Sequence, residues 1–325
     1  MLARTRTISY AKYGYLFSIP FVLTFLIFHL YPMIYTVVIG FTDLRGIGRT
    51  EINFLENPFE NFRLIFNNAT FRRAMNNTFL IWIMNFIPQM LVALLLTAWF
   101  TNRNLTVRGQ GMFKVLFYMP NIITAATIAI LFQSLFGYPK GPINDVFLTF
   151  GWIESPLNFH LQHWTARGVV AFIQFWMWYG HTMIILIAGV LGINPTLFEA
   201  AEIDGATATQ IFFRITLPRL KTIVLYTLVT SMIGGMQMFD IPRMFLWGGP
   251  DNATLTATLF IYNQAFSGSY LYNRAAAASI LLFLIIAVLS SILFFVMRDR
   301  GAEKLKRKQR QLKRSEKAAR KGVVL

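Results

Sequence analysis

Long blocks of apolar residues, each bounded by charged residues, dominate the hydrophobic pattern of this chain. A helix needs about 20 apolar residues to cross the roughly 30 Å hydrocarbon core of a bilayer, and the blocks reach that length. They predict six spans, at residues 15–39, 78–100, 115–136, 168–191, 223–246 and 275–297. The first block contains Pro20 and Pro32, and we expect a kink near one of them. The pattern therefore predicts an all-α integral membrane protein with six transmembrane helices.

The composition supports this interpretation. Of 325 residues, 55% are hydrophobic and 14% are charged, whereas soluble domains average about 45–50% and 25%. The chain has no cysteine, which excludes disulfides, cysteine-based zinc sites and thiolate nucleophiles. The high apolar fraction and the low charged fraction exclude an ordinary soluble globular protein.

The distribution of positive charge predicts an orientation. The formal net charge is +16, and residues 298–325 hold 12 Lys/Arg against 3 acidic residues. A basic tail after an apolar helix indicates a cytoplasmic tail close to lipid, not a nucleic-acid partner. Six spans place both termini on one side of the membrane, together with the loops 101–114 and 192–221. That side holds 21 Lys/Arg, and the opposite side holds 9. Without the tail the sides are even at 9 each, so the tail and the basic start of the chain decide the prediction that both termini are cytoplasmic.

The cytoplasmic loop between the fourth and fifth spans contains signals for folded structure. Asn194 is suited to cap a helix that has Pro195 at its first position, and Gly205 suits the left-handed residue that ends it. Residues 207–210 have the spacing of a capping box for a second short helix, which we expect Pro218 to stop. The loop is thus predicted to be a helix, a glycine turn and another helix.

The second short helix has an apolar face formed by Ile211, Phe212 and Ile215. Such an apolar face must be covered, and geometry alone leaves two alternatives. In the first, the element docks on another protein; in the second, it lies on the membrane or beneath its own helix bundle. A DNA-reading helix-turn-helix is a poor third interpretation, because the element is tethered to spans at both ends and is nearly neutral.

The same loop, residues 194–220, contains a long motif. Its members are Glu199, Ala200, Ala201, Asp204, Gly205, Ala206, Gln210, Leu217 and Pro218. This motif resembles the EAA loop of binding-protein-dependent ABC importer permeases. In that family the loop forms a coupling helix that docks into a groove of the cytoplasmic ATPase subunit, so the resemblance implies that role for these residues. One departure is Lys221, at a position where proline is frequent in the family.

Two further segments extend the resemblance. Residues 15–43 are similar to the first span of carbohydrate permeases, and residues 239–266 are similar to their late segment. These residues indicate the MalF- and MalG-like branch with the lactose, multiple-sugar and glycerol-3-phosphate permeases. The resemblance implies a MetI-like ABC transmembrane type-1 core at residues 72–297, preceded by a first transmembrane helix with its outer segment at 14–71. Cytoplasmic tails are expected at 1–13 and 298–325.

The resemblance also implies partners. A second homologous permease subunit, a pair of P-loop ATPase subunits and an extracellular solute-binding protein would assemble with this chain in a bacterial cytoplasmic (inner) membrane. The chain itself has no G-x-x-x-x-G-K-[ST] motif, so ATP must bind to the separate ATPase. We expect no cofactor in this chain and no nucleic-acid partner.

Motifs for catalysis and metal binding are not found in the sequence. No G-x-S-x-G, H-E-x-x-H or EF-hand pattern occurs, so we expect no enzyme activity. His160 and His163 stand three residues apart in an outer loop without a nearby third ligand, and we interpret them as a plain loop pair rather than a metal site.

Polar and aromatic residues in spans four and five are candidates for a substrate path, because sugars need hydrogen bonds beside aromatic faces. The candidates are Gln174, Trp176, Trp178, Tyr179, His181, Gln237 and Asp240, with Asn85, Gln89 and Asn121 as weaker ones. The alternative for each is ordinary packing with bonds between helices, and for Asp240 a local ion pair with Arg243. The pair Gly234 and Gly235 predicts a hinge in span five.

The function predicted from these residues is ATP-driven import of a mono- or oligosaccharide. A glycerol-3-phosphate or polyol importer is the alternative within the family. A phosphate ligand requires a cation in the path, and spans four and five have none before Arg243, which favours neutral sugars. A non-transporting membrane scaffold is the alternative from a different class.

Overall fold

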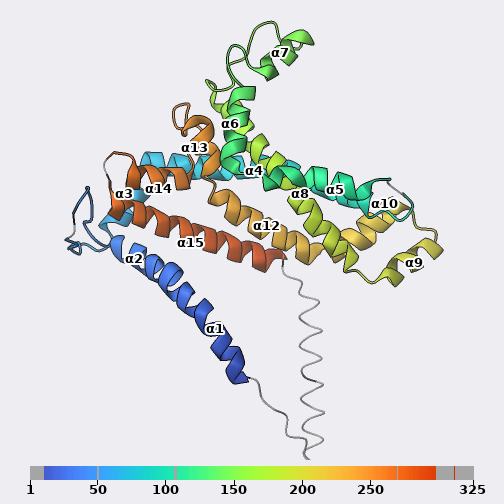
Figure 1. The fold of residues 1–325 in the computed structure, drawn as a ribbon, viewed down its shortest axis with the longest axis horizontal. Helices are drawn as coiled ribbons and strands as arrows, with labels where there is room; N and C mark the ends of the chain where they lie inside the picture. The colour runs from blue at the N-terminus through green and yellow to red at the C-terminus, as the bar shows by residue number, and fades with distance from the viewer. Residues whose placement is uncertain (1–10, 50, 106–107, 269, 298–310, 312–325) are drawn as a thin grey trace, which may run out of the picture. The chain divides into compact units, whose positions relative to one another are not determined.

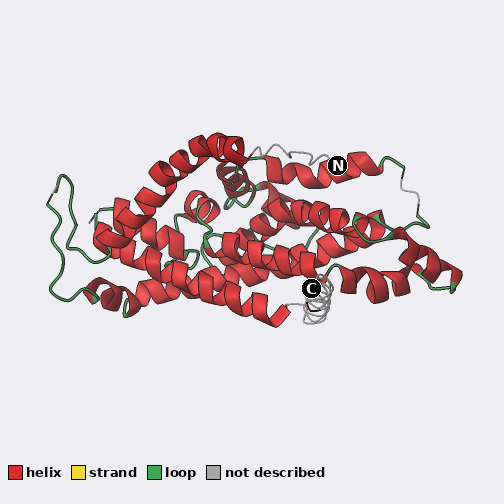
Figure 2. Cartoon of the chain, turned by 90° about the horizontal axis from the view of Figure 1, so that it is seen from below, coloured by secondary structure: helices red, strands yellow, loops and turns green. Residues whose placement is uncertain are grey.

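A computed structural model describes residues 11–49, 51–105, 108–268, 270–297 and 311 of the chain. The described residues form helices joined by turns and loops (Figure 1 and Figure 2). One isolated antiparallel bridge joins Thr42 and Phe54. The predicted basic tail, apart from residue 311, and most of the predicted N-terminal tail lie outside the described residues.

The chain is built from fifteen α-helical segments in the part that the structure describes, with two π-helical turns (η1, η3) and one 3-10 turn (η2). In chain order they are α1 (Ala11–Phe25), η1 (Leu26–Leu30), α2 (Tyr31–Ile39), α3 (Glu60–Phe66), α4 (Ala69–Phe100), α5 (Gln110–Tyr118), η2 (Met119–Ile122), α6 (Ala125–Leu135), α7 (Pro142–Thr149), α8 (His163–Leu191), α9 (Pro195–Ile203), α10 (Ala208–Ile211), η3 (Phe212–Thr216), α11 (Leu217–Arg219), α12 (Lys221–Met236), α13 (Asp240–Leu246), α14 (Ala257–Phe266) and α15 (Tyr272–Met297).

Four described helical stretches are long and apolar enough to cross a membrane. They are Lys12–Ile39, Ala69–Phe100, His163–Leu191 and Tyr272–Met297. Two bent pairs bring the number to six if each pair is one span: Gln110–Ile122 with Ala125–Leu135, bent by 92°, and Lys221–Met236 with Asp240–Leu246, bent by 42°. The predicted all-helical membrane fold is confirmed, with four to six candidate spans.

The third predicted span is not one straight helix. The chain leaves the α-helix at η2, where Pro120 has no N–H to donate. Ile123 is extended, and the Oγ1 of Thr124 then accepts the backbone N–H of Thr127 at 3.3 Å to begin α6. The expectation of a continuous helix at 115–136 was therefore wrong, because this local capping signal outweighs the apolar pattern.

The fifth predicted span bends at a different place from the one expected. Helix α12 continues through Gly234 and Gly235 and ends at Met236, so the bend lies at residues 237–239. A Cβ on Gly235 would collide with the ring of Trp82. The glycine thus serves close packing of α12 on α4, and the predicted hinge at the glycine pair was wrong.

The first span passes through Pro20 without a break in the helix. A π-turn, η1, lies directly before Pro32, and the N–H of Tyr31 donates to the carbonyl of Leu26. An irregularity was expected near Pro20 or near Pro32, and the structure has it near Pro32. There the wider π-turn accommodates the missing N–H of the proline.

The chain divides into two compact units. Among the described residues, unit 1 lies within 11–72 and 260–284, and unit 2 lies within 73–259 and from 285 onward. In unit 1 the buried Asn61 donates to the carbonyls of Gly40 (3.0 Å) and Thr42 (2.9 Å) and accepts from the Nδ2 of Asn273 (3.1 Å). This amide therefore holds the end of α2 and the start of α15 to α3.

Unit 2 contains two hydrophobic clusters at different levels of the bundle. One gathers α6, α8 and α13 around Ile128, Ile173 and Phe245. The other gathers the C-terminal halves of α4 and α8 around Ala93 and Leu186, and it includes Leu220 at the start of α12. These clusters fix the three helices α4, α8 and α12 that surround the cavity described below.

Candidate functional site

The loop between α8 and α12 folds as two helical segments around a glycine turn. The Oδ1 of Asn194 accepts the backbone N–H of Thr196 at 3.1 Å, and Pro195 takes the first position of α9. Gly205 follows α9 with φ +76°, a left-handed conformation that favours glycine. The predicted cap and glycine turn are confirmed.

The second segment begins with the predicted capping box. The N–H of Gln210 donates to the Oγ1 of Thr207 at 3.3 Å, and the N–H of Thr207 donates to the Oε1 of Gln210 at 2.8 Å. Pro218, however, does not stop the helix. The π-turn η3 precedes it, Pro218 lies in the first turn of α11, and the chain turns only at Leu220. The expected stop was wrong because the π-turn absorbs the missing N–H.

Most of the predicted coupling residues are exposed. Glu199, Ala200, Asp204, Gly205, Gln210 and Pro218 are exposed, whereas Ala201 is buried. Two large apolar side chains on the same element also face outward, since Ile203 is 86% and Phe213 61% exposed. By contrast, Phe198 packs on the cluster around Leu186. The element thus has one side on its own bundle and another without a covering among the described residues.

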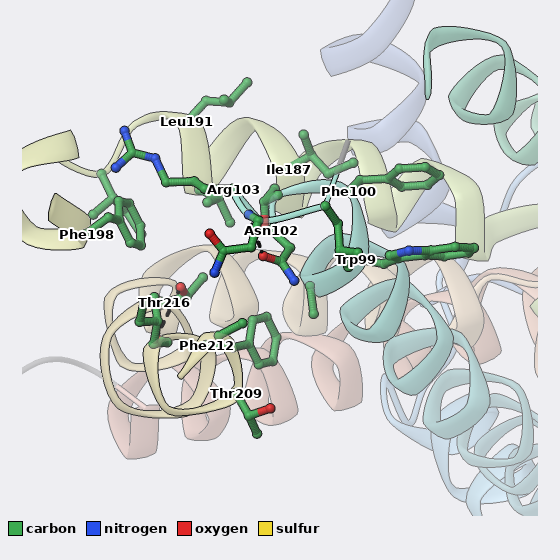
Figure 3. A pocket seen from close by; sticks show the side chains of 18 of the residues that line it. Trp99, Phe100, Asn102, Arg103, Ile187, Leu191, Phe198, Thr209, Phe212 and Thr216 are labelled. Carbon is green, nitrogen blue, oxygen red and sulfur yellow. Dashed lines mark hydrogen bonds between the residues drawn. The ribbon is translucent and has the colours of Figure 1, made fainter. Parts of the chain in front are cut away.

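A cavity of about 850 Å³ lies on the bundle side of this element. It is bounded by the end of α4 and the residues after it, the end of α8, α9, and the segment α10–η3 (Figure 3). Arg103, after α4, points toward Phe198 of α9 in this view. Its Nη2 lies 3.5 Å from the Oε1 of Glu199, and its Nη1 lies 3.9 Å from the Oε2 of Glu202.

A second cavity, of about 410 Å³, lies between α4, α8 and α12 and reaches the bend before α13. Its polar lining residues are Asn85, Gln89, Gln174, Trp178, His181, Thr182, Tyr226, Thr227, Thr230, Ser231, Gln237 and Asp240. Amides, hydroxyls and an indole therefore surround it, together with one carboxylate and one imidazole. The described lining includes no lysine or arginine.

The helical period explains which predicted path residues reach this cavity. Gln174, Trp178 and His181 are spaced by four and three residues and share one face of α8, and all three line the cavity. Gln237 and Asp240 line it from the bend. Asn85 and Gln89, the weaker candidates on α4, line it as well.

Two predicted path residues lie elsewhere. Trp176 packs against Phe132, with ring centroids 5.4 Å apart, in the cluster around Ile173. Tyr179 lies between Phe117 and Phe175. Neither lines the cavity that the other five share. They face away because Trp176 stands two residues from Gln174 and Tyr179 stands one residue from Trp178. Neither keeps the spacing of three to four residues that the lining face of α8 has.

The hydroxyl-bearing wall on α12 was not anticipated from the sequence. Tyr226, Thr227, Thr230 and Ser231 line the cavity, and Gly234 continues the row. A spacing of three to four residues from Tyr226 to Gly234 was the available signal.

His160 and His163 have separate environments. The ring of His160 packs edge-on against Phe245 at 5.1 Å, and its Nε2 is buried without a hydrogen-bond partner among the described residues. Burial lowers the pKa of His160 from its ordinary value. The Nε2 of His163 instead lies 3.3 Å from a carboxylate oxygen of Asp251. Among the described residues no group of three or more metal-ligating side chains occurs.

The family is shown by comparison with known proteins. The model of the family described as "Binding-protein-dependent transport system inner membrane component" matches residues 67–304. The chain belongs to this family. It is accordingly the permease of a binding-protein-dependent ABC importer, a multi-pass inner membrane protein and not an enzyme, and the resemblance inferred from the 194–220 loop is confirmed.

Individual relatives cover nearly the whole permease. It is 32% identical to the lactose transport system permease protein LacF of Rhizobium radiobacter, over 88% of this chain and 94% of LacF. It is 34% identical to the arabinooligosaccharides transport system permease protein AraP of Bacillus subtilis, over 88% of this chain and 90% of AraP. A chain of a solved bacterial ABC transporter for alginate has the same fold, with a TM-score of 0.75 at 23% identity, covering 88% of this chain and 95% of that chain.

Proposed function

We propose that this permease moves a neutral mono- or oligosaccharide through the cavity between α4, α8 and α12. The observation that supports this proposal is the lining of that cavity, where amides and hydroxyls stand beside Trp178 and Tyr226. Sugars present hydroxyls and apolar C–H faces, which match such a mixture. LacF and AraP, whose names refer to lactose and arabinooligosaccharides, are relatives that each cover 88% of this chain.

The charge of the cavity separates this proposal from its alternative. A glycerol-3-phosphate importer would need a permanent cation near the phosphate, and the described lining holds no lysine or arginine. Asp240 adds a negative charge instead, which disfavours an anion. A neutral sugar therefore fits this lining better than a phosphate ester, and a neutral polyol fits it by the same chemistry.

The residues 194–220 are proposed to couple this cavity to ATP hydrolysis on a separate subunit. The element directly joins α8 to α12, and both helices line the cavity. A displacement of α9 and α10 thus acts through the covalent chain on two of the three walls. The exposed motif residues and the exposed Ile203 and Phe213 suit a protein partner, and Gly205 supplies the turn between the two segments.

This proposal implies a complex and an orientation. The permease would assemble with a second permease subunit, a pair of P-loop ATPase subunits and an extracellular binding protein. The 194–220 element and both termini would then face the cytoplasm. ATP-driven closure of the ATPase pair would displace the element and shift the permease between inward-open and outward-open states, as a ligand on another subunit biases a two-state element.

The first experiment is to tag the chain, solubilise its native membrane gently and identify the co-purifying proteins by mass spectrometry. We expect a P-loop ATPase, a second permease and, after crosslinking, a solute-binding protein. Recovery of the chain without an ATPase after crosslinking would contradict the coupling proposal and favour the scaffold hypothesis.

The complex then permits a test of the substrate class. The complex would be reconstituted in proteoliposomes, and the binding protein identified by crosslinking would be added in its purified, uncrosslinked form. ATP hydrolysis would then be measured with lactose, an arabino-oligosaccharide, glycerol and glycerol-3-phosphate. We expect stimulation by a neutral sugar. Stimulation by glycerol-3-phosphate alone would contradict the proposed sugar substrate but would still agree with the proposed importer complex.

A further inference from the structure

The cavity beneath the 194–220 element is bridged at its rim by one side chain. Arg103 extends from the residues after α4 to α9, where it lies near the carboxylates of Glu199 and Glu202 at 3.5 and 3.9 Å. Its guanidinium carbon is 6.0 Å from the ring centroid of Phe198 (Figure 3). The three contacted residues lie within one turn of α9. One guanidinium therefore interacts with three residues of that helix at once.

Packing connects α9 to α4 through Phe198, which lies against the cluster that includes Ala93 and Phe100 of α4. Beyond this contact, a cavity of about 850 Å³ lies between the end of α4 and the α9 and α10 segments. Atoms across a void have no van der Waals contact and cannot pass a displacement to one another. In the part of the chain that the structure describes, the ion pairs of α9 are both made with Arg103.

This connection matters because α4 forms the third wall of the substrate cavity through Asn85 and Gln89. Helices α8 and α12 continue directly from the 194–220 element, whereas α4 has no such covalent continuity with it. A displacement of α9 reaches α8 and α12 along the chain. It reaches α4 through side chains, namely Arg103 at the rim of the cavity and Phe198 on the cluster that includes Phe100.

We propose that Arg103 is a positioning residue that transmits movement of α9 to α4, so that all three walls of the substrate cavity respond together. This inference rests on the proposed coupling role of residues 194–220. The side chains of Arg103, Glu199 and Glu202 are 44%, 55% and 37% exposed, and isolated pairs of this kind contribute little to stability. The connection thus holds the end of α4 to α9 without rigidly fixing the fold.

The absence of cysteine from the chain permits a direct test in the assembled complex. Single cysteines would be placed in the substrate cavity, Asn85→Cys on α4 and Thr230→Cys on α12, and their maleimide labelling would be compared without nucleotide and with ATP plus vanadate. With Arg103 present, we expect the nucleotide to change the labelling rate at both positions. With Arg103→Ala, the change at position 230 should persist, and the change at position 85 should fall by about threefold or more.

Matched variants separate transmission from general damage. Arg108→Ala removes an exposed cation of the same loop that forms no ion pair with any residue that the structure describes, and it should leave both responses intact. Arg103→Lys should retain part of the response at position 85. Arg103→Glu should abolish it, and adding Glu202→Arg should partly restore it by reversing the pair.

The outcomes distinguish this inference from the proposed function. An unchanged response at position 85 in Arg103→Ala, with the ATPase still bound, would overturn the inference and leave the coupling element in place. Loss of the bound ATPase in Arg103→Ala would also overturn it, because Arg103 would then serve docking. No nucleotide response at either position with Arg103 present would overturn the coupling proposal and the inference together.

Discussion

The Nε2 of Gln89 donates a 2.7 Å hydrogen bond to the Oγ1 of Thr182, which joins α4 to α8 at the wall of the proposed substrate cavity. Both residues are almost completely buried, at 4% and 3% exposure. The bond is an example of the polar packing between helices that was the alternative to a substrate role. The two interpretations are compatible, because a side chain held by one hydrogen bond still presents its remaining polar groups to the cavity.

The bond predicts a measurable coupling between the two residues. Gln89→Leu and Thr182→Val each leave a buried partner unsatisfied, and each should lower the free energy of unfolding by about 1 kcal/mol. The double variant should lose less than the sum of the two, which a double-mutant cycle on thermal unfolding of the purified permease in detergent would measure. Strict additivity would contradict the bond.

Local signals made the 194–220 element predictable. The cap at Asn194, the capping box at Thr207 and the turn at Gly205 each depend on residues within four positions of one another. Such signals do not depend on the rest of the fold. Pro218 shows the limit of this reasoning, because a π-turn several residues earlier changed its effect.

The lining of the proposed substrate cavity was only partly predictable, for reasons of geometry. Gln174 and Trp178 were identified because polar residues in an apolar helix are conspicuous. Trp176 looked equivalent in the sequence, but it stands two residues from Gln174 and faces the core. Thr230 was missed because its hydroxyl donates to the carbonyl of Tyr226 at 2.8 Å, which allows threonine to sit inconspicuously in an apolar helix.

A second prediction concerns the loop between α13 and α14. The Nδ2 of the buried Asn77 on α4 donates to the carbonyls of Asn252 (2.7 Å) and Leu255 (3.1 Å). Arg167 on α8 donates to the Oδ1 of Asn77 (2.8 Å) and to the carbonyl of Ala253 (2.9 Å). Asn77→Ala leaves these groups unpaired and should lower the free energy of unfolding by about 1–3 kcal/mol.

Hydrogen exchange would locate that loss. In Asn77→Ala, and to a lesser extent in Arg167→Lys, backbone amides at residues 252–257 should exchange faster, while those of α8 stay protected. Ser291→Ala, which removes an exposed hydroxyl bonded within its own helix, is the control. Equal exchange at residues 252–257 in Asn77→Ala and the unmodified protein would refute the role of this amide.

A third prediction concerns pH. Burial lowers the pKa of His160 in the folded protein below its ordinary value of 6.5, so the unfolded chain binds a proton at a pH where the folded protein does not. Stability therefore rises with pH below about 6.5 and is lost as the pH falls through that range. His160→Gln should flatten this dependence of the unfolding temperature between about pH 5 and 7. His163→Gln, the control, should retain it, and an unchanged slope in His160→Gln would exclude His160 as its source.

The fourth prediction concerns Gly205, which has φ +76° between α9 and α10. A Cβ at this position would meet no atom within 4 Å, so any effect of a substitution comes from the backbone conformation and not from a clash. A β-branched residue is strained at positive φ by about 1–2 kcal/mol, whereas asparagine tolerates this conformation. Gly205→Val should therefore disfavour the turn, and Gly205→Asn should preserve most of it.

A strain of that size reduces the population of the turn by about tenfold, and the spans outside the turn are unaffected. We expect Gly205→Val to reach normal membrane levels and to lose most uptake of the sugar that the unmodified permease transports. Gly205→Asn should retain most of that uptake. Gly109, also at positive φ with open space around it, provides the matched control, since Gly109→Val imposes the same backbone strain outside the coupling element. Full uptake by Gly205→Val would contradict the coupling role, and equal loss in Gly109→Val would assign the effect to strain alone.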